Sequence, residues 1–246
     1  MGFEDYGAEG VQYDTHDTRQ YALGTLMQLE DGRMYRYGRV GASGLTAGKL
    51  ASGAAEVANN ADNVAVATTA AGSRTVTVTL NATAAAKNAF QFGYLALSDG
   101  GGENGHYYKI AGHPAADASA TLELTLLASG GLPTAIGTAT GGLTANLYAD
   151  VVVAATTLVN SIAGVPNIDI AATEFGWFQI AGACAVLMNG APAIGASLVP
   201  SGTTAGAVDL LDRSDGSVLD TQNVGTVMGT VAVSTEYHMV QLDIRS

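Results

Sequence analysis

The sequence predicts an all-β protein with little helix, and three observations support this prediction. Short apolar runs alternate with polar residues at a period of two, as strand residues do. Gly, Pro, Asn and Asp fall between these runs at the places where turns are needed. The chain of 246 residues holds 32 glycines, and each glycine inside a helix costs about 1 kcal/mol relative to alanine. Long helices are therefore disfavoured even where alanine is frequent.

The first segment, residues 1–20, is polar and acidic. Tyr6, Tyr13 and His16 are spaced among five carboxylates. Such a segment buries too little apolar area to fold by itself, so it is either a mobile tail or an arm that orders against a partner. Three aromatic side chains would have no role in a solvated tail, which favours the arm.

A β-hairpin is predicted around Asp31-Gly32, with strands at 26–29 and 33–37. The Asp-Gly pair suits a type I′ turn, because both central residues of that turn need a positive φ. The alternation of a strand then sets two faces. Arg33, Tyr35 and Tyr37 lie on one face, and Met34 and Arg36 lie on the other.

Arginine is concentrated near this hairpin. Four of the ten basic residues occur here: Arg19, Arg33, Arg36 and Arg39. They are either a docking face for an acidic partner, through bidentate pairing with carboxylates, or internal partners of residues such as Glu30 and Asp31.

A second module is predicted to follow the small-residue stretch 41–63, with a boundary near residue 60. Its strands are expected at 64–67, 75–80, 94–97, 106–110 and 121–127. The run TVTVTL at 75–80 has a valine face and a threonine face. An apolar strand at 151–153 and a loop at 164–166 come next.

The stretch 175–200, FGWFQIAGACAVLMNGAPAIGASLVP, holds the only Trp and the only Cys. Strands are predicted at 177–180, 183–188 and 194–199, with a type I′ turn at Asn189-Gly190. Trp177 is interpreted as a core or interface anchor, with carbohydrate stacking as the alternative. Cys184 lies in an apolar alternating run and is expected to be a buried structural residue. After a turn at Asp215-Gly216, two final strands are predicted at 224–233 and 237–244.

Charge and composition exclude several classes of function. The formal net charge is −12, so the chain as a whole would repel nucleic acid and anionic membranes. No apolar run approaches the roughly 18 residues of a membrane-spanning helix. The N-terminus does not resemble a signal peptide, and one cysteine cannot form an internal disulfide, which favours a soluble protein made in a reducing compartment.

No pattern in the sequence predicts catalysis, a metal or a cofactor. The best candidate is the turn at 99–106, DGGGENGH, but it lacks the alternating oxygen ligands of calcium loops and the Lys of phosphate loops. A solvated turn is the preferred interpretation. The four histidines form no ligand pair, and no Gly-x-Ser-x-Gly elbow occurs. The chain is therefore predicted not to be an enzyme.

Four phrases of the sequence resemble capsid decoration, or cement, proteins of tailed bacteriophages. They are LEDGRMYRYGRVGASGLTAGKL, FGYLALSDGGGENGHYYKIAGHP, FGWFQIAGACAVLMNGAPAIGASLVPS and VGTVMGTVAVSTEYHMVQLDI. The resemblance implies a homotrimer on the outer surface of the virion head, made in the host cytoplasm, that clamps neighbouring major capsid subunits. It also implies one β-barrel built from residues 21–60 and 167–246, with an inserted, sandwich-like β module at 61–166.

On this interpretation, the expected contacts with the capsid or with other subunits come from the arm and the arginine-bearing hairpin. They are Tyr6, Tyr13, Arg33, Tyr35, Arg36 and Tyr37. The alternative function is a phage tail or fibre adhesin that binds host-surface glycan through Trp177, Tyr107 and Tyr108. A polysaccharide-degrading enzyme would need a close carboxylate pair in a cleft, and a major shell subunit would need a long helix that the sequence does not predict.

Overall fold

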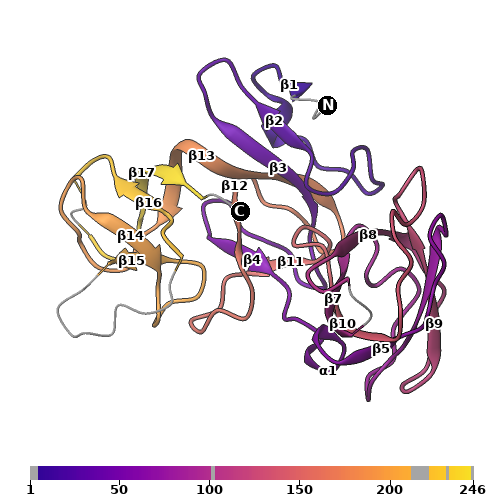
Figure 1. The fold of residues 1–246 in the computed structure, drawn as a ribbon. Coiled ribbons are helices and arrows are strands. Elements are labelled where there is room, and N and C mark those ends of the chain that lie inside the picture. The colour runs from indigo at the N-terminus through magenta and orange to yellow at the C-terminus, as the bar shows by residue number, and fades with distance from the viewer. Residues whose placement is uncertain (1–4, 101–102, 212–221, 231–232, 245–246) are drawn as a thin grey trace. The chain divides into compact units, whose positions relative to one another are not determined.

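The protein consists of two compact β units (Figure 1). A computed structural model describes residues 5–100, 103–211, 222–230 and 233–244. Unit 1 comprises Met1–Ala55 and Leu147–Ser246, and unit 2 comprises Glu56–Asn146. The predicted all-β class is confirmed. The helices of the described residues are a single 3-10 turn, η1 (Val11–Tyr13), and one short α-helix, α1 (Ala58–Ala61).

Unit 2 is a closed barrel of antiparallel strands in the order β10-β5-β6-β9-β8-β7, with β7 pairing back onto β10. Its strands are β5 (Val64–Val66), β6 (Thr75–Thr79), β7 (Tyr94–Gly100), β8 (Tyr107–Gly112), β9 (Thr121–Leu126) and β10 (Ala139–Thr144). The predicted alternation is visible in β6, where Val76 and Val78 are buried.

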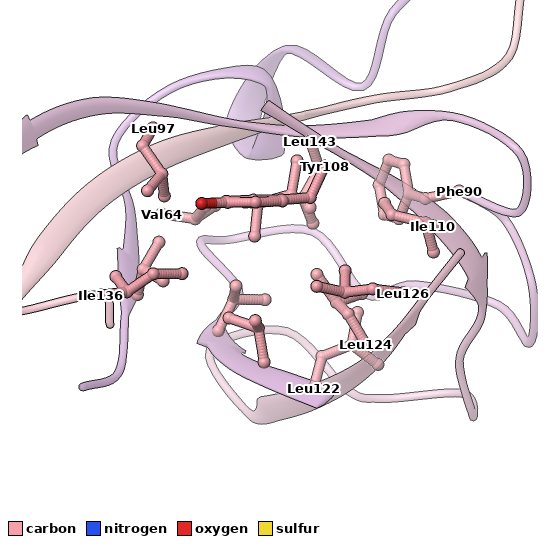
Figure 2. Packing of buried hydrophobic residues seen from close by; sticks show 14 of the residues in the cluster. Val64, Phe90, Leu97, Tyr108, Ile110, Leu122, Leu124, Leu126, Ile136 and Leu143 are labelled. Atoms are coloured by element: carbon pink, nitrogen blue, oxygen red, sulfur yellow. The ribbon is translucent and has the colours of Figure 1, made fainter. Parts of the chain in front are cut away.

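The barrel interior is filled by the apolar face of each strand. Figure 2 shows the side chains of Leu124, Leu126, Ile110 and Tyr108 pointing into the same interior, where they belong to one apolar cluster. Burial raises the pKa of the Tyr108 hydroxyl, and a hydrogen bond with Thr134 partly offsets this effect. In a small barrel the interior is filled by side chains of this kind.

Closure of the barrel depends on small residues in β10. The register between β10 and β7 shifts between Thr140 and Gly141. A Cβ at Gly142 would meet the carbonyl oxygen of Ala61, and one at Gly141 would meet that of Ala96. Glycine therefore lets β10 approach backbone on both sides, which is a common use of glycine in strands.

Unit 1 is built on one curled sheet whose main path runs β1-β2-β3-β13-β17-β16-β14-β15. Its strands are β1 (Asp5–Tyr6), β2 (Leu26–Gln28), β3 (Met34–Arg39), β13 (Phe175–Leu187), β14 (Ser197–Pro200), β15 (Val208–Leu210), β16 (Gly225–Val227) and β17 (Tyr237–Asp243). Off this path, β4 (Ala51–Gly53) pairs with β11 (Val151–Val153) and β12 (Ile162–Pro166), and β12 also pairs with β13.

Two parts of the predicted domain plan differ from the structure. The closed barrel is the inserted unit, whereas the terminal segments form an open curled sheet. The insert spans 56–146 instead of 61–166, because β11 and β12 pair with β4 and β13 and so belong to unit 1. The long strand β13 pairs with three neighbours, β3, β12 and β17.

Residues 175–187 of the stretch 175–200 form one long strand, β13, so the predicted break between 180 and 183 is wrong. The predicted break after residue 188 is present, because the next strand, β14, begins at Ser197. The register of β13 against β3 shifts between Gln179 and Ala181, which is a β-bulge. Gly182 follows this bulge with φ +89°. The glycine therefore accommodates the bulge and does not end the strand. Asn189-Gly190 does not join a hairpin, since β14 pairs with β15 and β16 and not with β13. The predicted turn at Asp215-Gly216 lies outside the described residues.

The hairpin at Asp31-Gly32 is confirmed, but its turn type differs from the prediction. β2 and β3 pair antiparallel. Gly32 has φ +86°, whereas Asp31 is not among the residues with positive φ. The Leu29 N–H donates to the Arg33 carbonyl and the Gly32 N–H donates to the Leu29 carbonyl, as in a type I turn followed by a glycine bulge.

The described part of the predicted arm, residues 5–20, lies against unit 1 itself. β1 pairs in parallel with β2, and His16 forms a β-bridge with Phe175. Gln12 is fully buried and its amide donates to Glu9. The sequence predicted that this segment becomes ordered against a partner, but part of it is already ordered by contacts within its own chain.

Candidate binding pocket on unit 1

The six predicted contact residues belong to unit 1 but occupy different layers of it. Tyr13 is 47 % exposed, whereas Tyr35 and Tyr37 are fully buried. Tyr35 and Tyr37 therefore support the surface from beneath and do not offer their side chains to a partner. The side chain of Tyr6 lies outside the described part of the chain.

Arg33 is engaged within the chain. Its guanidinium donates to Asp31 at 2.6 Å, pairs with Glu9 and reaches the Tyr35 hydroxyl at 3.2 Å. The Arg33 backbone N–H and guanidinium lower the pKa of Asp31. Burial alone would lower the pKa of Arg33, but its hydrogen bond to the Asp31 carboxylate and the nearby negative charges raise the pKa overall.

The other arginines of the hairpin region also have internal partners. Arg39 pairs with Asp150 at 2.6 Å, and the Arg36 guanidinium donates to the Gly24 carbonyl at 2.7 Å. Internal pairing, the second of the two predicted alternatives, is what the structure shows for these side chains.

Behind Arg33 lies a buried polar network, which we call the Gln179 network and which comprises Tyr35, Asn167, Gln179 and Cys184. The Tyr35 hydroxyl donates to Gln179 Oε1 at 3.3 Å, and Asn167 Nδ2 donates to the same oxygen at 3.0 Å. Gln179 Nε2 in turn donates to the carbonyls of Ala181 and Ala183, at 3.0 and 2.9 Å. The Gln179 side chain therefore satisfies carbonyl groups at the bulge in β13.

Cys184 is a structural member of this network, as predicted. It is buried, and its thiol lies 3.8 Å from Asn167 Oδ1. Burial raises the pKa of the Cys184 thiol to about 12, although the charge of Arg33 acts in the opposite direction. A thiol that stays protonated at neutral pH is a poor nucleophile.

A pocket of about 520 Å³ opens in front of the Gln179 network. Its floor is the stretch 183–185 of β13, and its sides come from Tyr13, the loop at 46–48, Asn167 and two residues of β17, Tyr237 and Met239. Tyr237 and Met239 are 47 and 46 % exposed. The pocket thus combines small residues below with aromatic and thioether side chains above, the usual lining of a binding site.

Next to the network, Trp177 is the centre of an aromatic cluster and confirms its predicted role as a packing anchor. It is 1 % exposed. Tyr21 and Tyr37 lie 5.2 and 5.0 Å from it between ring centroids, and Phe175 stacks on Tyr37. Such ring pairs stabilise a core beyond the area they bury.

The remaining candidates from the sequence lie in unit 2. The described part of the turn at 99–106 connects β7 to β8. Tyr107 is 68 % exposed, but Tyr108 and Trp177 are buried, so the three aromatic residues of the adhesin hypothesis do not line one groove. Among the described residues, no group of three or more His, Cys, Asp and Glu could hold a metal ion.

Sequence reasoning missed the pocket itself. Tyr13 and the two β17 residues are far apart in the chain, and only the pairing of β13 with β17 and the path of the arm bring them together. The run AGACA at 181–185 was the one available indication, because small residues on the open face of a strand leave room above it.

Comparisons with protein-family models, with curated proteins and with solved structures found no match to this chain. Within the described ranges, no helix has the length and apolar character needed to cross a membrane.

Proposed function

We propose that this chain is a non-enzymatic structural protein of a bacteriophage virion that binds the outside of the capsid lattice and stabilises the head as a decoration protein. Its partner in this proposal is the major capsid protein, and it acts as a homotrimer. The resemblance of four sequence phrases to decoration proteins supports the virion assignment. The surface of unit 1 supports a role in assembly.

The observation that carries the proposal is an exposed apolar strip on unit 1, formed by Ile194, Met228, Tyr237 and Met239. Tyr237 and Met239 share the outer face of β17. The Met228 N–H donates to the Met239 carbonyl at 3.0 Å, and the Gly195 N–H donates to the Val227 carbonyl. These bonds bring together the three backbone segments that carry the four residues.

Each side chain of the apolar strip is at least 46 % exposed. Large apolar side chains that are exposed on neighbouring segments often mark a surface that another protein covers. The strip continues into the pocket through Tyr237 and Met239. Many copies on a lattice would multiply a modest contact of this size by avidity.

Electron microscopy of the virion tests the proposal. We expect density for both β units on the outer surface of the head, at positions of local three-fold symmetry, with the apolar strip facing a capsid subunit. Absence of the polypeptide from the head shell, or its presence only in the tail, would overturn the proposal. Mass measurement of the purified protein checks the trimer independently.

A second candidate, recognition of host-surface glycan, is favoured by one feature of unit 2. Tyr94 and Tyr107 form an edge-to-face pair with ring centroids 5.7 Å apart, and Lys109 lies over the Tyr94 ring. Both tyrosines are exposed, and exposed aromatic faces can stack on sugars. Binding on a glycan array that is lost in Tyr107→Ala but kept in Tyr13→Ala would favour this function.

A further inference from the structure

One edge of β13 is uncovered along residues 183–185. The pairing with β3 ends where Ala181 faces Met34, whereas the pairing with β17 continues on the opposite edge to Leu187. Among the described residues, no strand takes the place of β3 beyond that point. An uncovered strand edge offers a template for another extended chain.

The N–H groups on this edge of β13 point away from β17, and the residues that carry them line the pocket. The Leu187 N–H donates to the Gly48 carbonyl at 2.9 Å, away from β17. Because backbone groups alternate between the two edges of a strand, the N–H groups of Ala183 and Ala185 point in the same direction as that of Leu187. The carbonyls of both residues already have partners, Gln179 Nε2 for Ala183 and the Cys184 thiol at 3.5 Å for Ala185, so this edge offers its N–H groups to an added strand.

The side chains around this edge suit an extended peptide. Ala183 and Ala185 rise little above the backbone, so an added strand can approach closely. Tyr13, Tyr237 and Met239 line the pocket of about 520 Å³, which is large enough for an apolar side chain of an incoming strand. In recognition by strand addition, the backbone bonds give affinity and such a pocket gives specificity.

The charge around the pocket is negative. Asp14 and Glu236 are exposed and adjoin two lining residues, Tyr13 and Tyr237. Asp169 is exposed and accepts the N–H of Ala47, which also lines the pocket, at 2.8 Å. Of the two nearby cations, Arg33 is already paired with two carboxylates, and the side chain of Lys49, which follows the lining residue Gly48, packs beside Gly206. A partner with basic residues beside its apolar side chain therefore has complementary charge.

We propose that unit 1 binds an extended polypeptide segment of a partner protein, which adds as a strand to the 183–185 edge of β13. An apolar side chain of the segment occupies the pocket, and Lys or Arg residues on either side of it face Asp14, Asp169 and Glu236. The strand addition rests on the geometry of unit 1. Only the identity of the partner, a segment of the major capsid protein, rests on the proposed function.

A displayed library of random peptides, selected on the full-length protein, tests the proposal without capsids. We expect enrichment of sequences that alternate apolar and polar residues and carry Lys or Arg beside a large apolar residue. The best peptide is then compared with two derivatives: one N-methylated on alternate backbone amides, and one with its basic residues replaced by Glu. We expect N-methylation to abolish binding and the Glu derivative to bind about three- to tenfold more weakly.

Variants of the protein locate the site. Ala185→Pro removes an N–H from the free edge without removing a bond to β17, and we expect it to abolish binding, whereas Ala185→Ser keeps the N–H and retains binding. Tyr13→Ala is expected to weaken binding at least tenfold, and Tyr107→Ala, an exposed tyrosine of unit 2, to leave it unchanged.

Three results would overturn the proposal. The first is that the N-methylated peptide binds as tightly as the parent peptide, and the second is that peptides are enriched no more on the wild-type protein than on Ala185→Pro. The third is a self-association that Ala185→Pro abolishes, because the edge would then bind a second copy of this chain. Peptide binding by a protein that is absent from the head shell would leave the strand addition intact and overturn only the capsid assignment.

Discussion

The two units use the same kind of strand but treat their edges differently. In unit 2, every strand has a neighbour on both sides, because β10 pairs with both β5 and β7. In unit 1, β13 shares its length among β3, β12 and β17 and keeps a short uncovered edge. Closure removes edges altogether, so the open unit is the one whose backbone remains available to a partner.

The interiors of the two units also differ, because that of unit 1 is divided and partly polar. Unit 2 is organised around one apolar cluster, whereas unit 1 has three apolar clusters and the Gln179 network between its sheet and its surface. A buried polar network fixes local geometry only while every member is satisfied. The shape of β13 at the pocket is therefore more sensitive to single polar substitutions than any strand of the barrel.

The largest effect is expected from preventing closure of the barrel. In Gly142→Ala, the new Cβ would meet the backbone carbonyl of Ala61, which cannot move without displacing α1. We expect unit 2 to lose at least about 3 kcal/mol of unfolding free energy. Gly130→Ala is the matched control, because a Cβ there meets nothing within 4 Å. Hydrogen exchange resolved by residue would show the loss in unit 2, and equal protection in both variants would contradict closure at β10.

The next effect is expected in the Gln179 network. Gln179→Leu removes the oxygen that accepts from the Tyr35 hydroxyl and the Asn167 amide, and it removes the amide that donates to the carbonyls of Ala181 and Ala183. We expect a loss of about 2–4 kcal/mol from unit 1, measured by denaturant unfolding. Gln241→Leu, at an exposed position of β17, is the control and should change stability by no more than about 0.5 kcal/mol. Similar losses in both variants would show that the network is not what supports β13.

A smaller effect, on binding and not on folding, is expected at the apolar strip. Met239→Lys places a charge where the proposed partner sits. We expect attachment to the head shell to weaken at least about tenfold, or about 1.4 kcal/mol, with stability unchanged to within about 0.5 kcal/mol. Leu127→Lys, at a similarly exposed apolar residue of unit 2, should leave attachment unchanged. The occupancy of each variant on purified virions measures its attachment. If only Leu127→Lys weakens attachment, the interface lies on unit 2.

These contrasts also explain what the sequence could predict. Local alternation placed β6 and the hairpin of β2 and β3 correctly, because strand period and turn chemistry act over a few residues. Local alternation wrongly predicted that β13 breaks at Gly182, and the predicted barrel was assigned to the terminal segments instead of the insert. Both errors arise because bulges and barrel closure depend on which distant strands pair. Tyr35 and Tyr37 were assigned to the expected face of β3, but only the packing of Trp177 and the N-terminal segment shows that this face is buried.

The smallest effect is a difference in acid sensitivity between the units. Burial lowers the pKa of His113 in unit 2, although a hydrogen bond with the Pro114 carbonyl opposes the shift. Its Nε2 accepts the Phe90 N–H at 3.0 Å, so the folded state favours the neutral ring. The unfolded chain therefore binds a proton first, and unit 2 begins to lose stability as pH falls below about 6.5. Asp31 in unit 1 has a lowered pKa, and its contribution is lost only as pH falls below about 4. Hydrogen exchange at pH 7 and pH 5.5 should show a modest loss of protection at the lower pH that is confined to unit 2 and is absent in His113→Gln. If the loss of protection persists in His113→Gln, another group is responsible for the acid sensitivity.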